Sequence, residues 1–245
     1  MKNVQTRSFE SAPPPRNVSS SKGFTLAEVL ITLGIIGVVA ALTMPALIGN
    51  YQKKEITTRL KKTYSIVQQA IRMSELDNGE IQYWGTISSG EDFFNKYFKN
   101  YFQYTNKYTS NELWQIAPRK LLNGTNYIGT TYAGNNRSYH IMLTDGTLLT
   151  FNYDSSNSIW VGIDTNGLSK PNQIGKDTFL FIFSSQYGLK PLGADGTPNE
   201  WNYGTYNRNN IKGNSANACN KQKAGYWCAA LIMNDGWEMR KDYPW

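Results

Sequence analysis

The sequence is poor in the residues that most often build catalytic and metal centres. Its 245 residues include one histidine, His140, and two cysteines. A Ser-His-Asp or Cys-His arrangement would have to use His140, whose alternation with apolar neighbours is typical of a packed strand residue. Neither a Gly-x-Ser-x-Gly elbow nor a phosphate-binding loop is present. We therefore expect a protein that is not an enzyme.

The two cysteines are close together near the end of the sequence, at Cys219 and Cys228. A zinc site usually takes four ligands from cysteine, histidine and carboxylates, and His140 is far away in the sequence. A disulfide bond that closes a short loop fits this spacing better. Such a bond indicates an oxidising compartment.

Basic residues exceed acidic ones, but most of them are not clustered. Lysine and arginine number 25 against 18 acidic residues, which gives a net charge of +7. The excess is spread along the chain except for one group on a predicted helix: Lys53, Lys54, Arg59, Lys61 and Lys62. Nucleic-acid binders usually show a basic stripe over one face, so we expect no nucleic acid as a partner.

Charge is nearly missing from one long stretch near the start. Residues 1–22 are polar, include Pro13, Pro14 and Pro15, and predict no regular structure. From Phe24 to Ile48 the chain is apolar, and the one charged side chain there is Glu28. At about 1.5 Å per residue a helix over this run would be roughly 37 Å long, enough to cross a bilayer with some tilt.

An amphipathic pattern follows the apolar run. Apolar residues recur every three or four positions on one helical face: Ile56, Leu60, Tyr64, Val67 and Ile71. Asp77-Asn78-Gly79 is a stop signal. We expect one helix from Phe24 to about Leu76, with its second half packed on a globular head. The predicted organisation is 1–23, a leader; 24–48, the apolar helix; 49–76, its amphipathic continuation; and 77–245, the head.

The head has the pattern of a mixed α and β domain. Residues 91–104 predict a short aromatic helical segment. Residues 139–143 and 147–151 flank Thr144-Asp145-Gly146 and predict a β-hairpin. Residues 159–163 and 179–183 predict further strands. The expected fold class is α+β, in which the long helix packs on a small antiparallel sheet in two layers.

The segment Lys22-Gly23-Phe24-Thr25-Leu26-Ala27-Glu28 precedes the apolar run, whereas an ordinary secretory cleavage site follows it. This heptapeptide resembles the leader of type IV prepilins and type II secretion pseudopilins. The resemblance implies that a prepilin peptidase cuts after Gly23 and methylates the new amine of Phe24. Cleavage there would leave the whole apolar segment on the mature protein. Gly23, without a side chain, suits the close approach of a protease.

The same resemblance implies how the subunit assembles. Glu28 falls at the fifth mature position and would pair with the Phe24 amine of a neighbouring subunit. Pro45 falls at mature position 22, where the family often has proline. The implied partners are the prepilin peptidase and other pilin or pseudopilin subunits. The implied location is a single pass through the inner membrane, with the head in the periplasm or outside, and an extracellular filament after assembly.

The head carries a second, shorter resemblance. Asp164-Thr165-Asn166-Gly167, the stretch 170–179 and the final Asp242-Tyr243-Pro244-Trp245 look similar to the heads of bacterial pilin-like type II secretion proteins. Two interpretations of Asp164, Asn166 and Asp177 stay open. Their oxygens could bind calcium, which major pseudopilins hold in a comparable loop, or they could form an Asx turn closed by Gly167. No other cofactor is expected.

Taken together, the motifs predict a structural subunit of a type II secretion pseudopilus or a type IV pilus, with the pseudopilus favoured. The alternative is a membrane-anchored module whose head binds a ligand such as DNA or a glycan. Dependence of filament assembly on Glu28 distinguishes the first from the second.

Overall fold

The computed structural model describes residues 23–127, 137–153, 158–186, 188–194 and 207–245. The predicted leader is outside the described residues except for Gly23. The chain divides into two compact units, Met1–Leu47 and Ile48–Trp245. Each unit is described by itself below, and the second one is called the head unit.

The helix α1 runs from Leu26 to Asn78 and contains Pro45. This confirms the prediction of one helix from the apolar run through the amphipathic segment, with an end two residues later than expected. Gly79 follows it with a φ of +81°, a conformation that glycine adopts without steric cost. The buried positions of α1 all belong to its second half: Thr57, Leu60, Thr63, Val67, Ala70, Ile71 and Ser74.

Six antiparallel strands form the sheet of the head unit, and they lie in the same order as in the sequence. Each strand therefore pairs with the one before it. Their bounds are β1 Tyr104–Tyr108, β2 Ser138–Leu143, β3 Leu148–Tyr153, β4 Ile159–Asp164, β5 Thr178–Ser184 and β6 Gly188–Pro191.

The predicted hairpin and the two further strands are confirmed within one or two residues. In the hairpin, Tyr139 pairs with Phe151 and Ile141 with Leu149. Gly146 closes the turn with a φ of +83°. The expected helical segment 91–104 is shorter than predicted. It consists of α2 (Gly90–Phe93) and the π-helix η2 (Phe94–Phe98), and Tyr104 already belongs to β1.

One face of the sheet packs against α1, α2 and η2. Tyr64 of α1 lies 5.4 Å from Phe181 of β5 between ring centroids. Phe93 lies 6.1 Å from Phe151 and 5.4 Å from Phe183. Offset and tilted aromatic pairs at these separations stabilise a core beyond their area burial. The amphipathic half of the helix therefore supplies one layer, as predicted, and the aromatic segment, for which no layer was predicted, belongs to the same layer.

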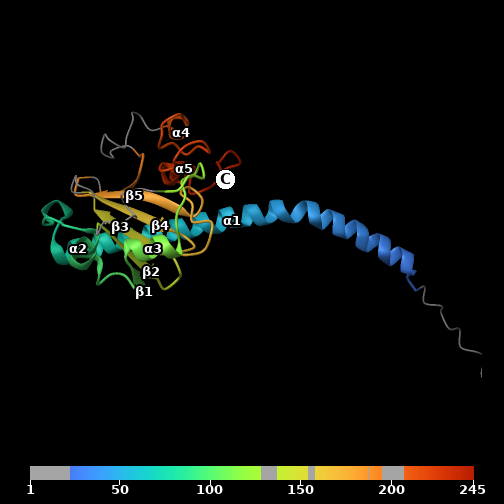
Figure 1. The fold of residues 1–245 in the computed structure, drawn as a ribbon, viewed down its shortest axis with the longest axis horizontal. Coiled ribbons are helices and arrows are strands. Elements are labelled where there is room, and N and C mark those ends of the chain that lie inside the picture. The colour runs from blue at the N-terminus through green and yellow to red at the C-terminus, as the bar shows by residue number, and fades with distance from the viewer. Residues whose placement is uncertain (1–22, 128–136, 154–157, 187, 195–206) are drawn as a thin grey trace, which may run out of the picture. The chain divides into compact units, whose positions relative to one another are not determined.

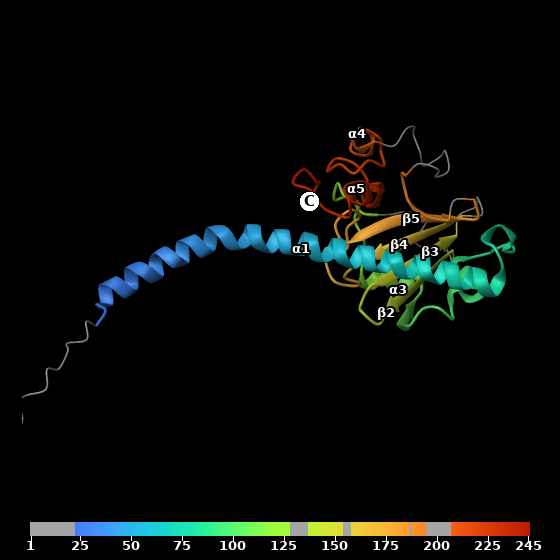
Figure 2. The same ribbon diagram turned by 180° about the vertical axis from the view of Figure 1, so that it is seen from behind.

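The opposite face is covered as well, which the sequence analysis did not predict. The helix α3 (Ser110–Ile116) brings Ser110 to 3.4 Å from the His140 ring on β2. Tyr226 packs edge-on against Trp160 of β4 at 6.3 Å. All six residues of β4 are buried. Figures 1 and 2 show α1 and α3 on opposite sides of the sheet.

The last part of the chain forms a helical cap beside β5. It contains α4 (Arg208–Ile211) and α5 (Cys228–Asn234). In both views this red segment lies next to β5, and the end marked C lies beside the part of α1 that belongs to the head unit (Figures 1 and 2). The cap was predicted only as a loop closed by a disulfide.

Candidate functional site

The predicted processing residues come just before α1. Gly23 and Phe24 precede the first helical residue, Leu26, and 89% of Phe24 is exposed. A Cβ added to Gly23 would meet nothing within 4 Å. The peptide bond between these two residues is therefore open to a protease. Lys22, the basic residue of the motif, lies outside the described residues.

Glu28 closes the first turn of α1 by binding Thr25. One oxygen of its carboxylate accepts hydrogen bonds at 2.8 Å from both the backbone N–H and the hydroxyl of Thr25. The Thr25 hydroxyl in turn accepts from the Glu28 N–H at 3.2 Å. This reciprocal pattern is a capping box, and its Thr-x-x-Glu signature was present in the sequence but not used there. Within the chain, the Glu28 carboxylate is thus bonded to Thr25, the residue next to Phe24.

The apolar half of α1 satisfies its own polar groups and leaves its apolar ones uncovered. Thr32 donates to the carbonyls of Glu28 and Val29, and Thr43 donates to that of Val39. A stretch of this helix reaches a mean hydropathy of 2.3 with no residue buried. By length and composition it can cross a membrane. Such a helix needs lipid or other helices to cover it.

The other predicted assembly residue, Pro45, lies inside α1 and close to the end of the apolar run. Proline removes one helical hydrogen bond at this point. Gly34 and Gly37 lie a few turns earlier, and a Cβ at either position would meet nothing within 4 Å. Packing within the first unit therefore gives no reason for these glycines. Small residues on a membrane helix let a neighbouring helix approach closely.

Asp164 and Asp177 lie in the head unit near a buried arginine that was not predicted, and the backbone N–H of Asn166 donates to Asp164 Oδ1 at 3.4 Å. Arg119 has 2% of its surface exposed, and it donates to Asp164 Oδ2 from Nη2 at 2.9 Å and from Nε at 3.3 Å. The Thr178 hydroxyl donates to the same oxygen at 3.0 Å. No periodic pattern around residue 119 distinguishes this arginine from the exposed basic residues.

The carboxylate oxygens considered for calcium already accept hydrogen bonds from protein groups, whereas Asn166 Oδ1 has no hydrogen-bond donor among the described residues. Asp177 accepts from the backbone N–H of Asn172 and of Gln173, each at 2.7 Å. Asn166 directs its side-chain amide at the Lys170 carbonyl, 3.1 Å away. In the described part of the chain there is no group of three or more histidine, cysteine, aspartate or glutamate residues arranged to hold a metal. A guanidinium takes the cation's place beside Asp164, so this donor set does not fit calcium.

Burial has the largest influence on the protonation of this cluster. Burial raises the pKa of Asp164 to about 7, against the Arg119 guanidinium, which acts to lower it. Burial also raises the pKa of Asp177, while its two backbone hydrogen bonds act in the opposite direction. Two carboxylates and one guanidinium would carry one negative charge in the core. A proton on either carboxylate removes that charge.

His140 is a core residue. It is completely buried, and its Nδ1 lies 2.9 Å from the Thr150 hydroxyl. Burial, together with the nearby Arg119 charge, lowers its pKa to about 3, so the ring is neutral at neutral pH. A buried neutral imidazole between two hydroxyl groups serves packing rather than proton transfer to a substrate.

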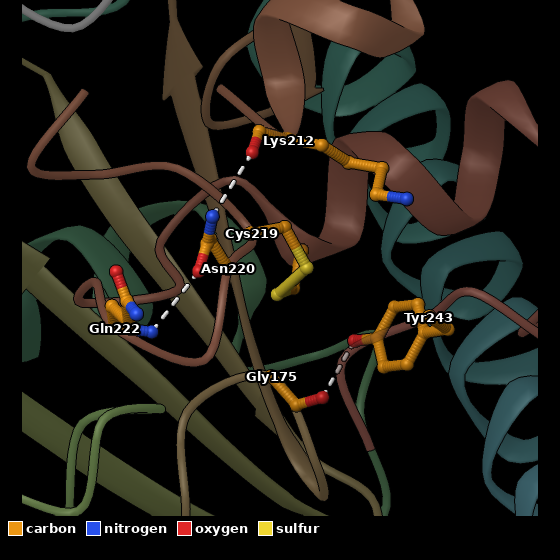
Figure 3. The surroundings of a disulfide bond; sticks show 7 residues. Gly175, Lys212, Cys219, Asn220, Gln222 and Tyr243 are labelled. Atoms are coloured by element: carbon orange, nitrogen blue, oxygen red, sulfur yellow. Dashed lines mark hydrogen bonds between the residues drawn. A yellow bond between two sulfur atoms is a disulfide. The ribbon is translucent and has the colours of Figure 1, made fainter. Parts of the chain in front are cut away.

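Cys219 and Cys228 are joined by a disulfide bond, as predicted, with their Cα atoms 4.7 Å apart. Gly175 lies against it, because a Cβ there would be 2.8 Å from the Cys228 sulfur. The Tyr243 hydroxyl donates to the Gly175 carbonyl at 2.5 Å (Figure 3). The disulfide thus closes a loop within the helical cap and packs against the loop that carries Asp177.

Two protein-family models match different parts of the chain. A model described as "Prokaryotic N-terminal methylation motif" matches residues 18–44. A model described as "Family of unknown function (DUF6613)" matches residues 46–245, which is most of the chain. No solved structure matches.

Curated relatives agree with the first match. Type II secretion system core protein G of Escherichia coli (strain K12) is 35% identical over 63 residues, 26% of this chain and 43% of that protein. The core protein G of Klebsiella michiganensis is 39% identical over 61 residues, 24% of this chain and 41% of that protein. Prepilin peptidase-dependent protein D of Escherichia coli (strain K12) is 31% identical over 62 residues, 25% of this chain and 42% of that protein.

The chain spans about two fifths of the length of these relatives. The methylation motif, the long apolar helix and the antiparallel sheet agree with the resemblance stated from the sequence. The chain belongs to the DUF6613 family, and its N-terminal motif and curated relatives support a type IV pilin-like or pseudopilin family.

Proposed function

We propose that this protein is a filament subunit of a type II secretion pseudopilus or a closely related type IV pilus. A prepilin peptidase cuts it after Gly23 and methylates Phe24. The mature subunit resides in the inner membrane through the apolar half of α1, with its head on the outer side. It then joins a filament made with other pilin or pseudopilin subunits.

The observation that carries this proposal is the methylation motif at the start of an uncovered apolar helix. The motif covers residues 18–44, and none of the most apolar stretch of α1 is buried within the chain. A plain membrane anchor gives no reason for a carboxylate near its start. A carboxylate in an apolar span costs about 2.5–3.5 kcal/mol on insertion scales and usually has a partner.

Glu28 and the new Phe24 amine supply opposite charges at the same depth of the span. The Glu28 carboxylate binds Thr25 in the single subunit and is reached from outside the chain, because it is exposed. In a filament, Glu28 of an incoming subunit would neutralise the Phe24 amine of the subunit already in place. That pairing sets the axial register between subunits.

Mass spectrometry of the mature protein is the direct test. In cells with an active prepilin peptidase, the first residue should be Phe24 with one methyl group on its amine. Gly23→Val should block cleavage, because a branched side chain crowds the scissile bond. Gly34→Ala is the matched control, since it changes a glycine inside the helix and should be cleaved normally. An intact leader in the wild-type protein would contradict the proposal.

Gene deletion separates the two kinds of filament. Loss of extracellular enzymes from the culture medium, with surface pili unchanged, supports the pseudopilus. Loss of surface pili with secretion unchanged supports the type IV pilus.

A further inference from the structure

The proposed assembly does not use the cluster of basic residues on α1. These residues, Lys53, Lys54, Arg59, Lys61 and Lys62, line two grooves of the head unit. A groove of about 710 Å³ lies between residues 50–65 of α1 and the turn 236–239, and its basic residues are Lys53, Lys54, Lys61 and Lys62. A second groove, of about 500 Å³, contains Arg59, Lys170, Lys176 and Trp245. Seven basic and two acidic side chains line the two grooves together.

Aromatic side chains lie among these lysines. The ammonium group of Lys53 is 5.7 Å from the ring centroid of Trp245, a cation–π distance. Tyr51, two residues earlier on α1, is 68% exposed. Trp237 packs against Tyr64 at 5.2 Å and has a φ of +68°. A bulky residue with positive φ is strained, so the surrounding structure holds this turn in place.

The sequence brings this surface close to the membrane. Lys54 is six residues beyond Ile48, the last residue of the apolar run. Six residues span at most about 20 Å whatever angle the chain takes. The headgroup layer on each side of a bilayer is about 5–8 Å thick. Tyrosine, tryptophan and lysine are the residues that gather at that layer, because their side chains have an apolar body and a polar tip.

We propose that this surface, defined by Tyr51, Lys53, Lys54 and Trp245, docks the head on the headgroups of an anionic bilayer before the subunit joins a filament. The inference rests on the membrane residence in the proposed function. The lysines bind phosphate groups, and the two aromatic rings enter the interface. Docking limits how far the head swings about the end of the span, which presents each subunit to the filament base in one orientation.

A second copy of the head matches the positive charge of this surface less well than an anionic bilayer does. Among the residues that the structure describes, most acidic side chains outside the two grooves already bind partners in their own chain. Asp92 pairs with Lys96 at 3.0 Å, and Asp242 binds Arg208 and Lys212. A bilayer that contains phosphatidylglycerol instead offers many unpaired anionic groups close to the end of the span.

The test uses the full chain reconstituted in vesicles of phosphatidylcholine alone or mixed with phosphatidylglycerol. A lipid that carries a quencher on its headgroup reports nearby tryptophans, and subtraction of the Trp245→Phe signal isolates Trp245. We expect Trp245 to be quenched in the anionic vesicles and much less in the neutral ones. Each lysine near an anionic surface shifts the docked-to-undocked ratio about fivefold, so K53Q/K54Q should lower it about 25-fold at low salt.

The matched control is Lys99→Gln with Lys107→Gln, which removes the same charge from two exposed lysines on η2's end and β1. This control should leave the quenching of Trp245 unchanged. Equal quenching in both kinds of vesicle, or in both lysine double variants, would overturn the proposal. So would a K53Q/K54Q defect confined to filament assembly, because that result assigns the groove to a neighbouring subunit.

Flotation of the vesicles separates this inference from the proposed function. Chains that float without quenching of Trp245 would overturn the docking and leave the membrane subunit intact. Chains that do not float would overturn the membrane residence and the docking together. Near-ultraviolet circular dichroism of each variant shows that its head is folded.

Discussion

Glu28 and Asp164 are both carboxylates among apolar side chains, but their partners come from very different distances along the chain. Glu28 binds Thr25, three residues away, and is exposed. Asp164 is buried and binds Arg119, 45 residues away, and Thr178, 14 residues away. The head unit thus pairs this buried carboxylate through contacts distant in its own chain, whereas Glu28 has only local contacts.

Apolar side chains show the same contrast. Leu60, Val67 and Phe181 in the head unit are completely buried, while Leu26 and Leu42 on the apolar half of α1 are 79% and 76% exposed. Burial of a leucine side chain stabilises a protein by about 1.5–3 kcal/mol. The head therefore gains its stability inside the chain, and the apolar half gains its stability from lipid or from other subunits.

Replacement of Glu28 should give the largest effect, and it acts on assembly alone. Glu28→Leu should still insert and still be cleaved after Gly23. Its amount in filaments should fall about tenfold or more, because removing one partner of a buried charge pair costs about 3–5 kcal/mol. Shear fractionation of cells measures the filament fraction.

Thr32→Val is the matched control for Glu28→Leu. It removes a polar group from the same helix, but Thr32 binds only its own helix backbone in the described structure. We expect normal filaments from it. Normal amounts of Glu28→Leu in the filament fraction would remove the role of the charge pair and with it the contrast between the two carboxylates.

Replacement of Arg119 should destabilise the head without touching the helix. Arg119→Met leaves Asp164 and Asp177 buried without their cation, and we expect a loss of about 3–5 kcal/mol in the free energy of unfolding. Arg59→Met is the control, because Arg59 pairs with Glu55 on the surface at 3.2 Å and should cost about 1 kcal/mol or less. Denaturant unfolding of the detergent-solubilised chain measures both.

A second variant distinguishes the lost charge from lost packing. Arg119→Met combined with Asp164→Leu removes both charged partners and should recover part of the stability. If the double variant were less stable than Arg119→Met alone, the arginine would matter for its shape rather than for its charge.

The disulfide should contribute less than the buried cation. Its loop spans nine residues, and closing a loop of this size is worth roughly 2–3 kcal/mol in the chain-entropy model. Cys219→Ser with Cys228→Ser should lower the melting temperature of the head and leave cleavage and membrane insertion unchanged. Two free thiols in protein taken from the cell exterior would contradict the bond.

Local patterns explain which parts of this fold the sequence predicted. The period of Ile56, Leu60 and Tyr64 predicted the packed half of α1, and Asp145-Gly146 predicted the hairpin turn between β2 and β3. Tyr104–Tyr108 was missed as a strand because its middle three residues are exposed and polar. An edge strand with few buried residues has little apolar alternation to detect.

The site was predicted in the same uneven way. The processing segment is continuous, so its residues could be identified together. The Arg119 cluster joins residues 119, 164, 177 and 178, and it forms only when the segment after α3 meets the end of β4 and the start of β5. Sequence spacing carries no information on such a contact. The two acidic residues were therefore noticed, but their partner was not.

His140 should make the stability of the head depend on pH. Its pKa is about 3 in the folded state against about 6.5 when unfolded, so the unfolded chain binds a proton first as pH falls. The contribution of His140 to the free energy of unfolding is fully present above about pH 6.5 and declines as the pH falls from there to about 3. We expect a decline of about 1.4 kcal/mol per pH unit.

Because the pKa of Asp164 is raised, its contribution to stability increases as the pH falls, opposite to that of His140. The stability of the wild type as a function of pH would therefore hide the effect of His140. The stability difference between the wild type and His140→Gln removes the shared contribution of Asp164. That difference should shrink by about 2 kcal/mol between pH 6.5 and pH 5. A difference that stays constant over this range would show that His140 does not titrate on unfolding.

Calcium should have the smallest effect of all, because Arg119 already supplies the positive charge beside Asp164. Calcium takes six to eight oxygen ligands, and here the carboxylates of Asp164 and Asp177 accept from protein donors. A ligand that binds the folded state raises the melting temperature with its concentration. We expect no shift of the head's melting temperature between millimolar calcium and a chelator. Arg119→Met sharpens this comparison, since removing the guanidinium leaves two carboxylates without a cation beside them. Calcium should then stabilise the variant and not the wild type. A clear shift in the wild-type protein would instead establish calcium as a partner of Asp164, Asn166 and Asp177.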